Sequence, residues 1–171
     1  MKYSVSPQIL QSNDPSQIAW DAIEPIWDDI PFSPFRKLAE FLEELSQGQA
    51  SLIALDWCQK EIRNGGLRLL FENSTGNLVP WAIRGFHAIG AVTYAQVLDR
   101  AAGMLGSPYP QAAAARKRIM ADWSPAQSQE LEELDTSFFT LLNSPEHDLE
   151  PIRGGYVLRH PEQFIDQTEG G

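Results

Sequence analysis

Residues 50–64 carry apolar side chains on almost every side of a helix, and this constrains the fold more than any other part of the chain. At 3.6 residues per turn these apolar residues cannot share one face. They are Leu52, Ile53, Leu55, Trp57, Cys58 and Ile62. A helix that is apolar nearly all round needs several neighbours to cover it, so we expect it at the centre of the fold. Its polar residues Asp56, Lys60 and Arg63 form a single stripe.

Two short glycine-containing motifs follow this helix. Asn64, Gly65 and Gly66 are typical of a helix end, because glycine adopts the left-handed conformation without a Cβ clash. Residues 67–71 are apolar and should begin a new buried segment. Asn73, Ser74, Thr75 and Gly76 have the composition of a turn. We therefore interpret both motifs, with Asn64, Gly65, Gly66, Asn73 and Gly76, as structural.

Helical patterns dominate the rest of the chain. Further helices are predicted over residues 35–46, 80–89, 91–105, 111–123, 125–142 and 155–165. No stretch alternates β-branched and polar residues with a period of two, so strands should be minor or absent. Because 171 residues with 43% hydrophobic content suffice for one core, we predict a single all-α domain over residues 1–171. It should be a bundle of about seven to nine helices, with residues 1–13 and 167–171 as flexible ends.

Two further helix starts combine a capping residue with a proline at the first helical position. Asp14-Pro15-Ser16-Gln17 and Ser124-Pro125-Ala126-Gln127 both also place a glutamine where a capping box requires it. Pro25 should kink the first of these helices or end it early.

The charge of the chain is unevenly distributed around a net value of −10. Residues 14–48 hold eight acidic and two basic side chains, and residues 122–171 hold eleven acidic and two basic ones. Residues 49–121 hold four acidic and eight basic ones. The only basic cluster, Arg116-Lys117-Arg118, is short and could pair with carboxylates of the same fold. Direct nucleic-acid binding, which needs clustered exposed Lys and Arg, is therefore not expected.

No set of residues predicts a catalytic, metal or cofactor site. The histidines His87, His147 and His160 are scattered, and Cys58 lies among apolar residues, where a small buried hydrophobe is the expected role. We therefore predict no catalytic residue, no metal and no cofactor. No apolar run approaches the roughly 18 residues that span a bilayer, so a cytoplasmic protein without a membrane partner is expected.

The candidate partner-binding residues are acidic. Carboxylates three or four residues apart on a helix lie about 5–6 Å from one another, which is comparable with the spacing of phosphates along a nucleic-acid strand. Acidic helices could therefore present an array of charge like that of DNA, although they could also serve only as solvated faces. The candidates are Asp21, Asp28, Asp29, Glu40, Glu43, Glu44, Glu130, Glu132, Glu133, Asp135, Glu146, Asp148 and Glu150.

Four segments occur in a fixed order along the chain: residues 61–66 (EIRNGG), 71–76 (FENSTG), 89–91 (IGA) and 156–164 (YVLRHPEQF). Together they resemble the bacterial DNA-mimic protein family, a domain long catalogued as of unknown function, over residues 50–166. Family members usually carry an aromatic residue after the two glycines. Residues 67–70 (LRLL) stand there instead, so the chain resembles a divergent member.

The resemblance implies an acidic, α-helical, cytoplasmic protein that forms a homodimer. The characterised relative imitates double-stranded DNA and occupies a helix-turn-helix transcription factor. The leading hypothesis is therefore a non-enzymatic module that binds a protein partner, such as a basic helix-turn-helix protein. Two alternatives stay open: an immunity-type or antitoxin-like protein that neutralises a partner enzyme, and an enzyme with an unrecognised helical pocket.

Overall fold

The computed structural model describes residues 2–166 and has eight α-helices and no strand in this range. The α-helices are α1 (Pro15–Asp21), α2 (Phe35–Glu43), α3 (Gln47–Glu72), α4 (Val79–Ala88), α5 (Val92–Gly103), α6 (Ala113–Ala121), α7 (Pro125–Leu142) and α8 (Leu149–Arg159). Five short 3₁₀ helices connect them: η1 (Pro7–Gln11), η2 (Glu24–Asp29), η3 (Ser74–Leu78), η4 (Pro145–His147) and η5 (Pro161–Gln163). The prediction of a single all-α domain is confirmed.

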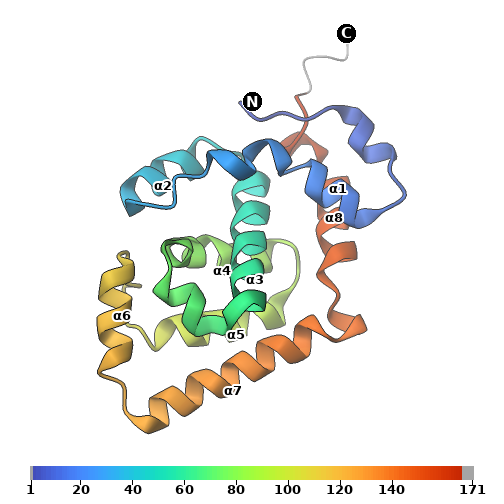
Figure 1. Ribbon diagram of the computed structural model, residues 1–171. Coiled ribbons are helices and arrows are strands. Elements are labelled where there is room, and N and C mark those ends of the chain that lie inside the picture. The colour runs from blue at the N-terminus through green and yellow to red at the C-terminus, as the bar shows by residue number, and fades with distance from the viewer. Residues whose placement is uncertain (1, 167–171) are drawn as a thin grey trace.

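Helix α3 runs through the middle of the molecule (Figure 1). Helix α4 packs against it and α5 packs on α4, while α1 and α8 pack against each other and Arg153 of α8 contacts Asp56 of α3. The side chains of Leu52, Ile53, Leu55, Cys58 and Ile62 are all fully buried. The apolar circumference of residues 50–64 thus predicted the central helix correctly, because only an element covered on several sides can bury such a pattern. None of the described helices has the length and apolar character needed to cross a membrane.

The two glycines interrupt α3 as predicted, although the chain continues as a helix immediately after them. Gly66 has φ +76°, and a Cβ atom there would lie 2.3 Å from Oδ2 of Asp135 on α7. The backbone N–H of Leu67 donates to Oδ1 of the same carboxylate at 2.9 Å. Asp135 therefore caps the restarted helix from 68 residues away in sequence, and only a glycine at position 66 leaves room for it.

The predicted helix starts are partly confirmed. Ser124 and Gln127 form the expected capping box, and Asp14 accepts a hydrogen bond from the N–H of Ser16 at 2.9 Å. Gln17 does not complete a capping box, because its side-chain amide donates to Asp21 instead. The first helix ends at Asp21, before Pro25, as the proline predicted.

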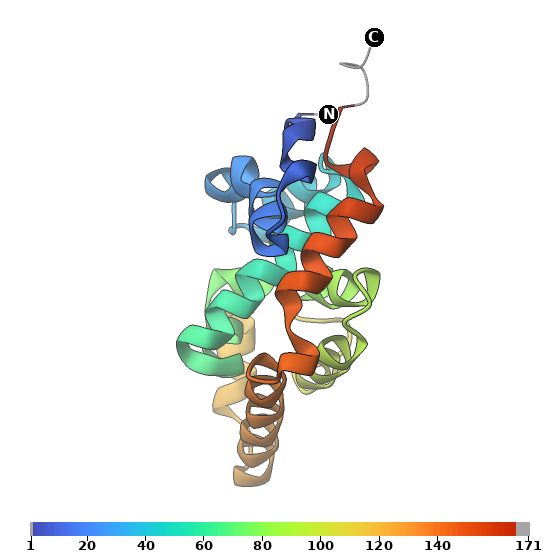
Figure 2. The same cartoon turned by 90° about the vertical axis from the view of Figure 1, so that its right-hand side faces the viewer.

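The first and last described segments of the chain lie close together in both views (Figures 1 and 2). Residues 2–13, predicted as a flexible end, lie against the body: Tyr3 is 9% exposed and the N–H of Val5 donates to the carbonyl of Phe164 at 3.0 Å. The last helix was predicted too late in the chain, since α8 covers Leu149–Arg159 and only the short η5 follows. The other predicted flexible end, residues 167–171, lies outside the described residues.

Candidate functional site

Ten of the thirteen candidate acidic residues fall into two groups at opposite ends of the molecule, and the other three precede or begin α8. Those of α1, η2 and α2 lie beside the start of α3, whereas those of α7 lie beyond its kink (Figures 1 and 2). The part of α3 before the glycines lies between the groups, and its 18 residues from Gln47 span about 27 Å at 1.5 Å per residue. The carboxylates therefore do not form one continuous surface.

The first group gathers around the N-terminal segment. The hydroxyl of Tyr3 donates to Oδ2 of Asp29 in η2 at 2.8 Å, and its ring packs edge-on against Phe41 of α2 with centroids 6.0 Å apart. Tyr3 thus bridges η2 and α2, two elements that between them carry five exposed carboxylates. We call these residues the η2–α2 acidic cluster: Asp28, Asp29, Glu40, Glu43 and Glu44.

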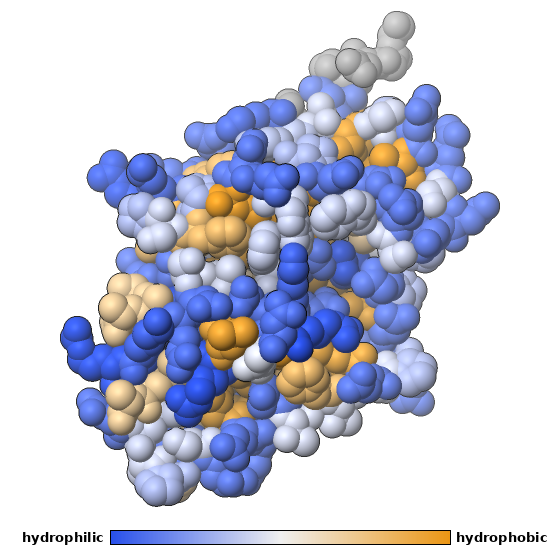
Figure 3. Space-filling view, in the orientation of Figure 1, coloured by the Kyte–Doolittle hydropathy of each residue, from blue (hydrophilic) through white to orange (hydrophobic). Residues whose placement is uncertain are grey.

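Three cations accompany this cluster without neutralising it. Arg36 Nε lies 2.7 Å from Glu40 Oε1, and Lys2 Nζ lies 3.6 Å from Glu44 Oε2. All four side chains are more than half exposed, so these ion pairs contribute little to stability. Lys37 is exposed as well. Hydrophilic side chains project along the upper edge of the molecule, over η2 and α2 (Figure 3). Asp21 on α1 is half-buried and accepts the amide of Gln17.

Only part of the acidic series on α7 is free. Glu130 Oε1 accepts from Arg100 Nη2 of α5 at 2.8 Å. Asp135 is the half-buried cap of Leu67, and burial raises the pKa of its carboxyl group. Glu132 and Glu133 are exposed and take part in no ion pair among the described residues. The free acidic face of α7 is thus reduced to two residues.

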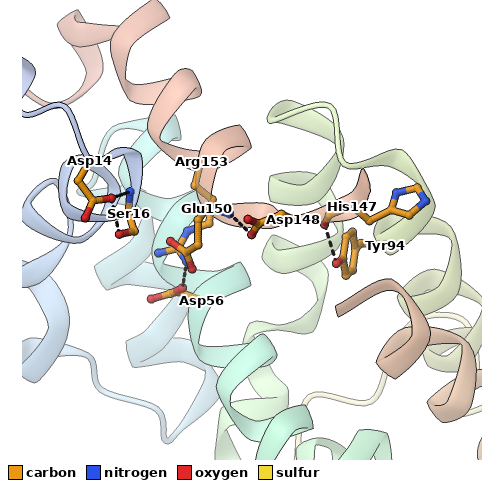
Figure 4. A network of polar contacts seen from close by, with 8 residues as sticks. All are labelled: Asp14, Ser16, Asp56, Tyr94, His147, Asp148, Glu150 and Arg153. Carbon is orange, nitrogen blue, oxygen red and sulfur yellow. Dashed lines mark hydrogen bonds and ion pairs between the residues drawn. The ribbon is translucent and has the colours of Figure 1, made fainter. Parts of the chain in front are cut away.

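The acids that precede and begin α8 mostly have structural partners. Asp148 caps α8 by accepting the N–H of Glu150 at 3.1 Å, while Glu146 in η4 is exposed (Figure 4). Arg153 Nη1 lies 2.8 Å from Asp56 Oδ1 and 3.1 Å from Glu150 Oε1, and the Arg153 side chain is only 5% exposed. Burial raises the pKa of Asp56, and Arg153 opposes that shift. Glu150 therefore belongs to an ion-pair network with Arg153 and Asp56.

Arg116 is the structural residue that sequence reasoning missed. Its side chain is fully buried without a carboxylate partner among residues 2–166, and it donates four hydrogen bonds at 2.8 or 2.9 Å. The acceptors are the carbonyls of Phe71, Asn73 and Pro110 and the side-chain oxygen of Asn77. A Cβ at position 76 would lie 2.9 Å from Arg116 Nη2 and 2.4 Å from the carbonyl of Leu70.

The second glycine motif therefore forms part of the binding site of the Arg116 guanidinium, as well as a turn. The sequence predicted Arg116-Lys117-Arg118 as one basic cluster. In the structure Arg116 is buried, and only Lys117 and Arg118 are exposed. A signal was present in the sequence: Arg116 precedes Met120 by four residues, so it lies on the buried side of its helix.

The residues tested for enzyme chemistry do not converge. Cys58 is fully buried in α3, where burial raises the pKa of its thiol, and His87 is exposed near the end of α4. His160 follows the last residue of α8, and the carbonyl of His147 accepts the Tyr94 hydroxyl at 2.9 Å (Figure 4). Among residues 2–166, no group of three or more His, Cys, Asp or Glu could hold a metal ion.

Comparison with known proteins identifies the family. A search of curated proteins and a search of solved structures each found no significant match. A family model described as DMP19-like protein matches residues 43–160, which run from the last residue of α2 to the end of α8 and include both glycine motifs. That match covers well over half of the chain, so this protein belongs to the DMP19-like family of DNA-mimic proteins.

Proposed function

We propose that this protein is a non-enzymatic binding module that occupies the DNA-contacting surface of a basic DNA-binding regulator in the cytoplasm. Membership of a DNA-mimic family supports this role. The net charge of −10 supports it as well, because a basic face made to neutralise phosphates attracts clustered carboxylates on the same electrostatic grounds.

The observation that carries the proposal is the η2–α2 acidic cluster. Its five carboxylates are all exposed, and Tyr3 fixes the two elements that bear them. Elements that are held in place lose less backbone freedom on binding than mobile segments do, which favours a specific partner. We assign this cluster as the primary contact.

Glu132 and Glu133 on α7 are a secondary contact in this proposal. The part of α3 that lies between the two acidic groups is about 27 Å long, and the half-sites read by a helix-turn-helix dimer are spaced by roughly 34 Å. A dimeric regulator could thus contact both ends of one molecule.

Following the family resemblance, we also propose that this protein itself forms a homodimer, which sedimentation equilibrium at micromolar concentration would test.

A displacement experiment tests the proposal. A basic helix-turn-helix regulator is bound to its fluorescently labelled operator DNA, and the protein is titrated in while anisotropy is recorded. Release of the DNA is expected, and so is a large loss of competition for E40Q/E43Q/E44Q.

The matched control is D99N/D122N/E162Q, which removes the same charge from exposed acids outside the candidate set. It should compete nearly as well as the unaltered protein. If both triple variants lose competition equally, net charge accounts for the effect and the assignment of the cluster is wrong. Failure of the unaltered protein to displace the DNA would contradict the proposed function.

A further inference from the structure

The polar stripe of the central helix faces a cavity that the proposed function does not use. Asp56, Lys60 and Arg63 of α3 line a hollow of about 600 Å³ beside α1, η2 and α8. Trp20 of α1 and Trp27 of η2 form its apolar wall. This volume lies within the range of about 300–1,000 Å³ that is usual for small-molecule sites.

The uncompensated charge of this cavity is positive. Its carboxylates, Asp56 and Glu150, both contact Arg153, at 2.8 and 3.1 Å. Lys60 and Arg63 are exposed and make no ion pair within 4.0 Å among residues 2–166. In a chain of net charge −10, two unpaired cations one helical turn apart favour an anionic ligand.

The aromatic wall is preorganised. Trp27 stacks on Trp57 with centroids 4.3 Å apart, and Trp20 meets Trp27 edge-on at 5.1 Å. Lys60 Nζ lies 5.0 Å from the ring centre of Trp27 and 4.7 Å from that of Trp57. A cation is thus held beside a rigid aromatic surface, an arrangement that can bind a ring and an attached charge together.

Two nearly buried side chains in the same wall keep hydrogen-bonding atoms that the described residues do not use. They are Oε1 of Gln59 and Nε of Arg153, in side chains that are 8% and 5% exposed. Buried polar atoms in native proteins usually have partners. Both atoms are themselves shielded from solvent, so a ligand in this cavity reaches them only if the surrounding side chains move.

We propose that the cavity binds a small organic anion with an aromatic body, whose charge pairs with Lys60 and Arg63 while its ring packs against Trp20 and Trp27. Carboxylate, sulfonate and phosphate groups share the required chemistry. The site is distinct from the η2–α2 acidic cluster and from Glu132 and Glu133 on α7.

Titration with two probes tests this site. Adenosine monophosphate supplies a phosphate on an aromatic body, and 8-anilinonaphthalene-1-sulfonate supplies a sulfonate; binding is followed by tryptophan emission and by calorimetry at low salt. Saturable binding of at least one probe at one site per chain is expected, and the preferred probe distinguishes the anion. K60Q/R63Q should weaken that binding by about tenfold or more.

The matched control is K117Q/R118Q, which removes the same charge from two exposed residues of α6. A second variant, Q17W, places a bulky ring at the exposed Gln17 in the cavity wall without changing any charge, and should abolish probe binding while the thermal midpoint stays the same. No saturable binding of either probe, equal weakening in both double variants, or undiminished binding in Q17W would each overturn the proposal. Operator displacement does not enter these readouts, so the proposed function can fail or hold independently.

Discussion

Replacement of Arg116 by methionine should remove about 4 kcal/mol from the free energy of unfolding. The guanidinium satisfies three backbone carbonyls and one side-chain amide oxygen in a fully buried position. Each buried acceptor left without a donor costs about 1–3 kcal/mol. We use the lower end of this range, about 1 kcal/mol, for each of the four acceptors. The carbonyl of Asn73 also accepts the N–H of Gly76 at 3.1 Å, so it is not left without a donor.

A loss of that size is a large fraction of the 5–15 kcal/mol typical of a whole domain. R116K keeps the charge, but an ammonium group has three donors at one point and cannot reproduce four bonds from a planar fork, so an intermediate loss of about 2 kcal/mol is expected. The control R118M changes an exposed residue of the same helix and should stay within about 0.5 kcal/mol of the unaltered protein.

Urea denaturation followed by tryptophan fluorescence measures all three variants. Hydrogen exchange adds a local readout. In R116K the backbone amides of residues 71–78 should lose protection from exchange before those of α3 that precede residue 71. The account is refuted if R116M unfolds within about 1 kcal/mol of the unaltered protein, since a methionine that only fills space would then replace the arginine adequately.

Three further predictions concern the kink of α3 and the N-terminal segment. G66A should destabilise the fold by about 2 kcal/mol, because its backbone has φ +76° and its Cβ would collide with Asp135; equal stability in urea would contradict this. Because burial raises the pKa of Asp135, folding favours its protonated form, and its ionisation lowers stability as the pH rises through that pKa. D135N keeps an acceptor for the N–H of Leu67, so it should be at least as stable as the unaltered protein at neutral pH. The difference in the free energy of unfolding should vanish at a pH below the normal pKa range of aspartate. A D135N variant that is less stable at neutral pH would contradict this prediction. Y3F removes the hydrogen bond to Asp29, so it should lower the free energy of unfolding by about 1 kcal/mol and weaken regulator binding. Urea denaturation measures the first effect and the displacement assay the second. If both values are unchanged, Tyr3 does not organise the cluster.

The local parts of the fold could be predicted from the sequence. Leu52 to Ile62 specify a central helix because a pattern that is apolar all round can be buried only there. Ser124 and Gln127 specify a helix start through contacts within four residues, and the structure places the capping box there. Both inferences needed only neighbours along the chain.

The long-range contacts could not be predicted in this way. Asp135 was a candidate for partner binding because it lies among acids on one helix, yet it caps Leu67 from another element. Tyr3 is far from α2 in sequence, although it fixes Asp29 beside that helix. Charge pattern alone does not distinguish a free carboxylate from one that a distant backbone amide needs, because that depends on how the helices pack.

The dependence of regulator binding on salt tests the central claim most directly. The affinity of the unaltered protein and of E40Q/E43Q/E44Q for the regulator is measured by calorimetry from about 50 to about 200 mM salt. If the η2–α2 acidic cluster takes the place of DNA phosphates, affinity falls steeply with salt for the unaltered protein, and the triple variant binds more weakly with a clearly shallower slope. Equal slopes for the two proteins would contradict the claim.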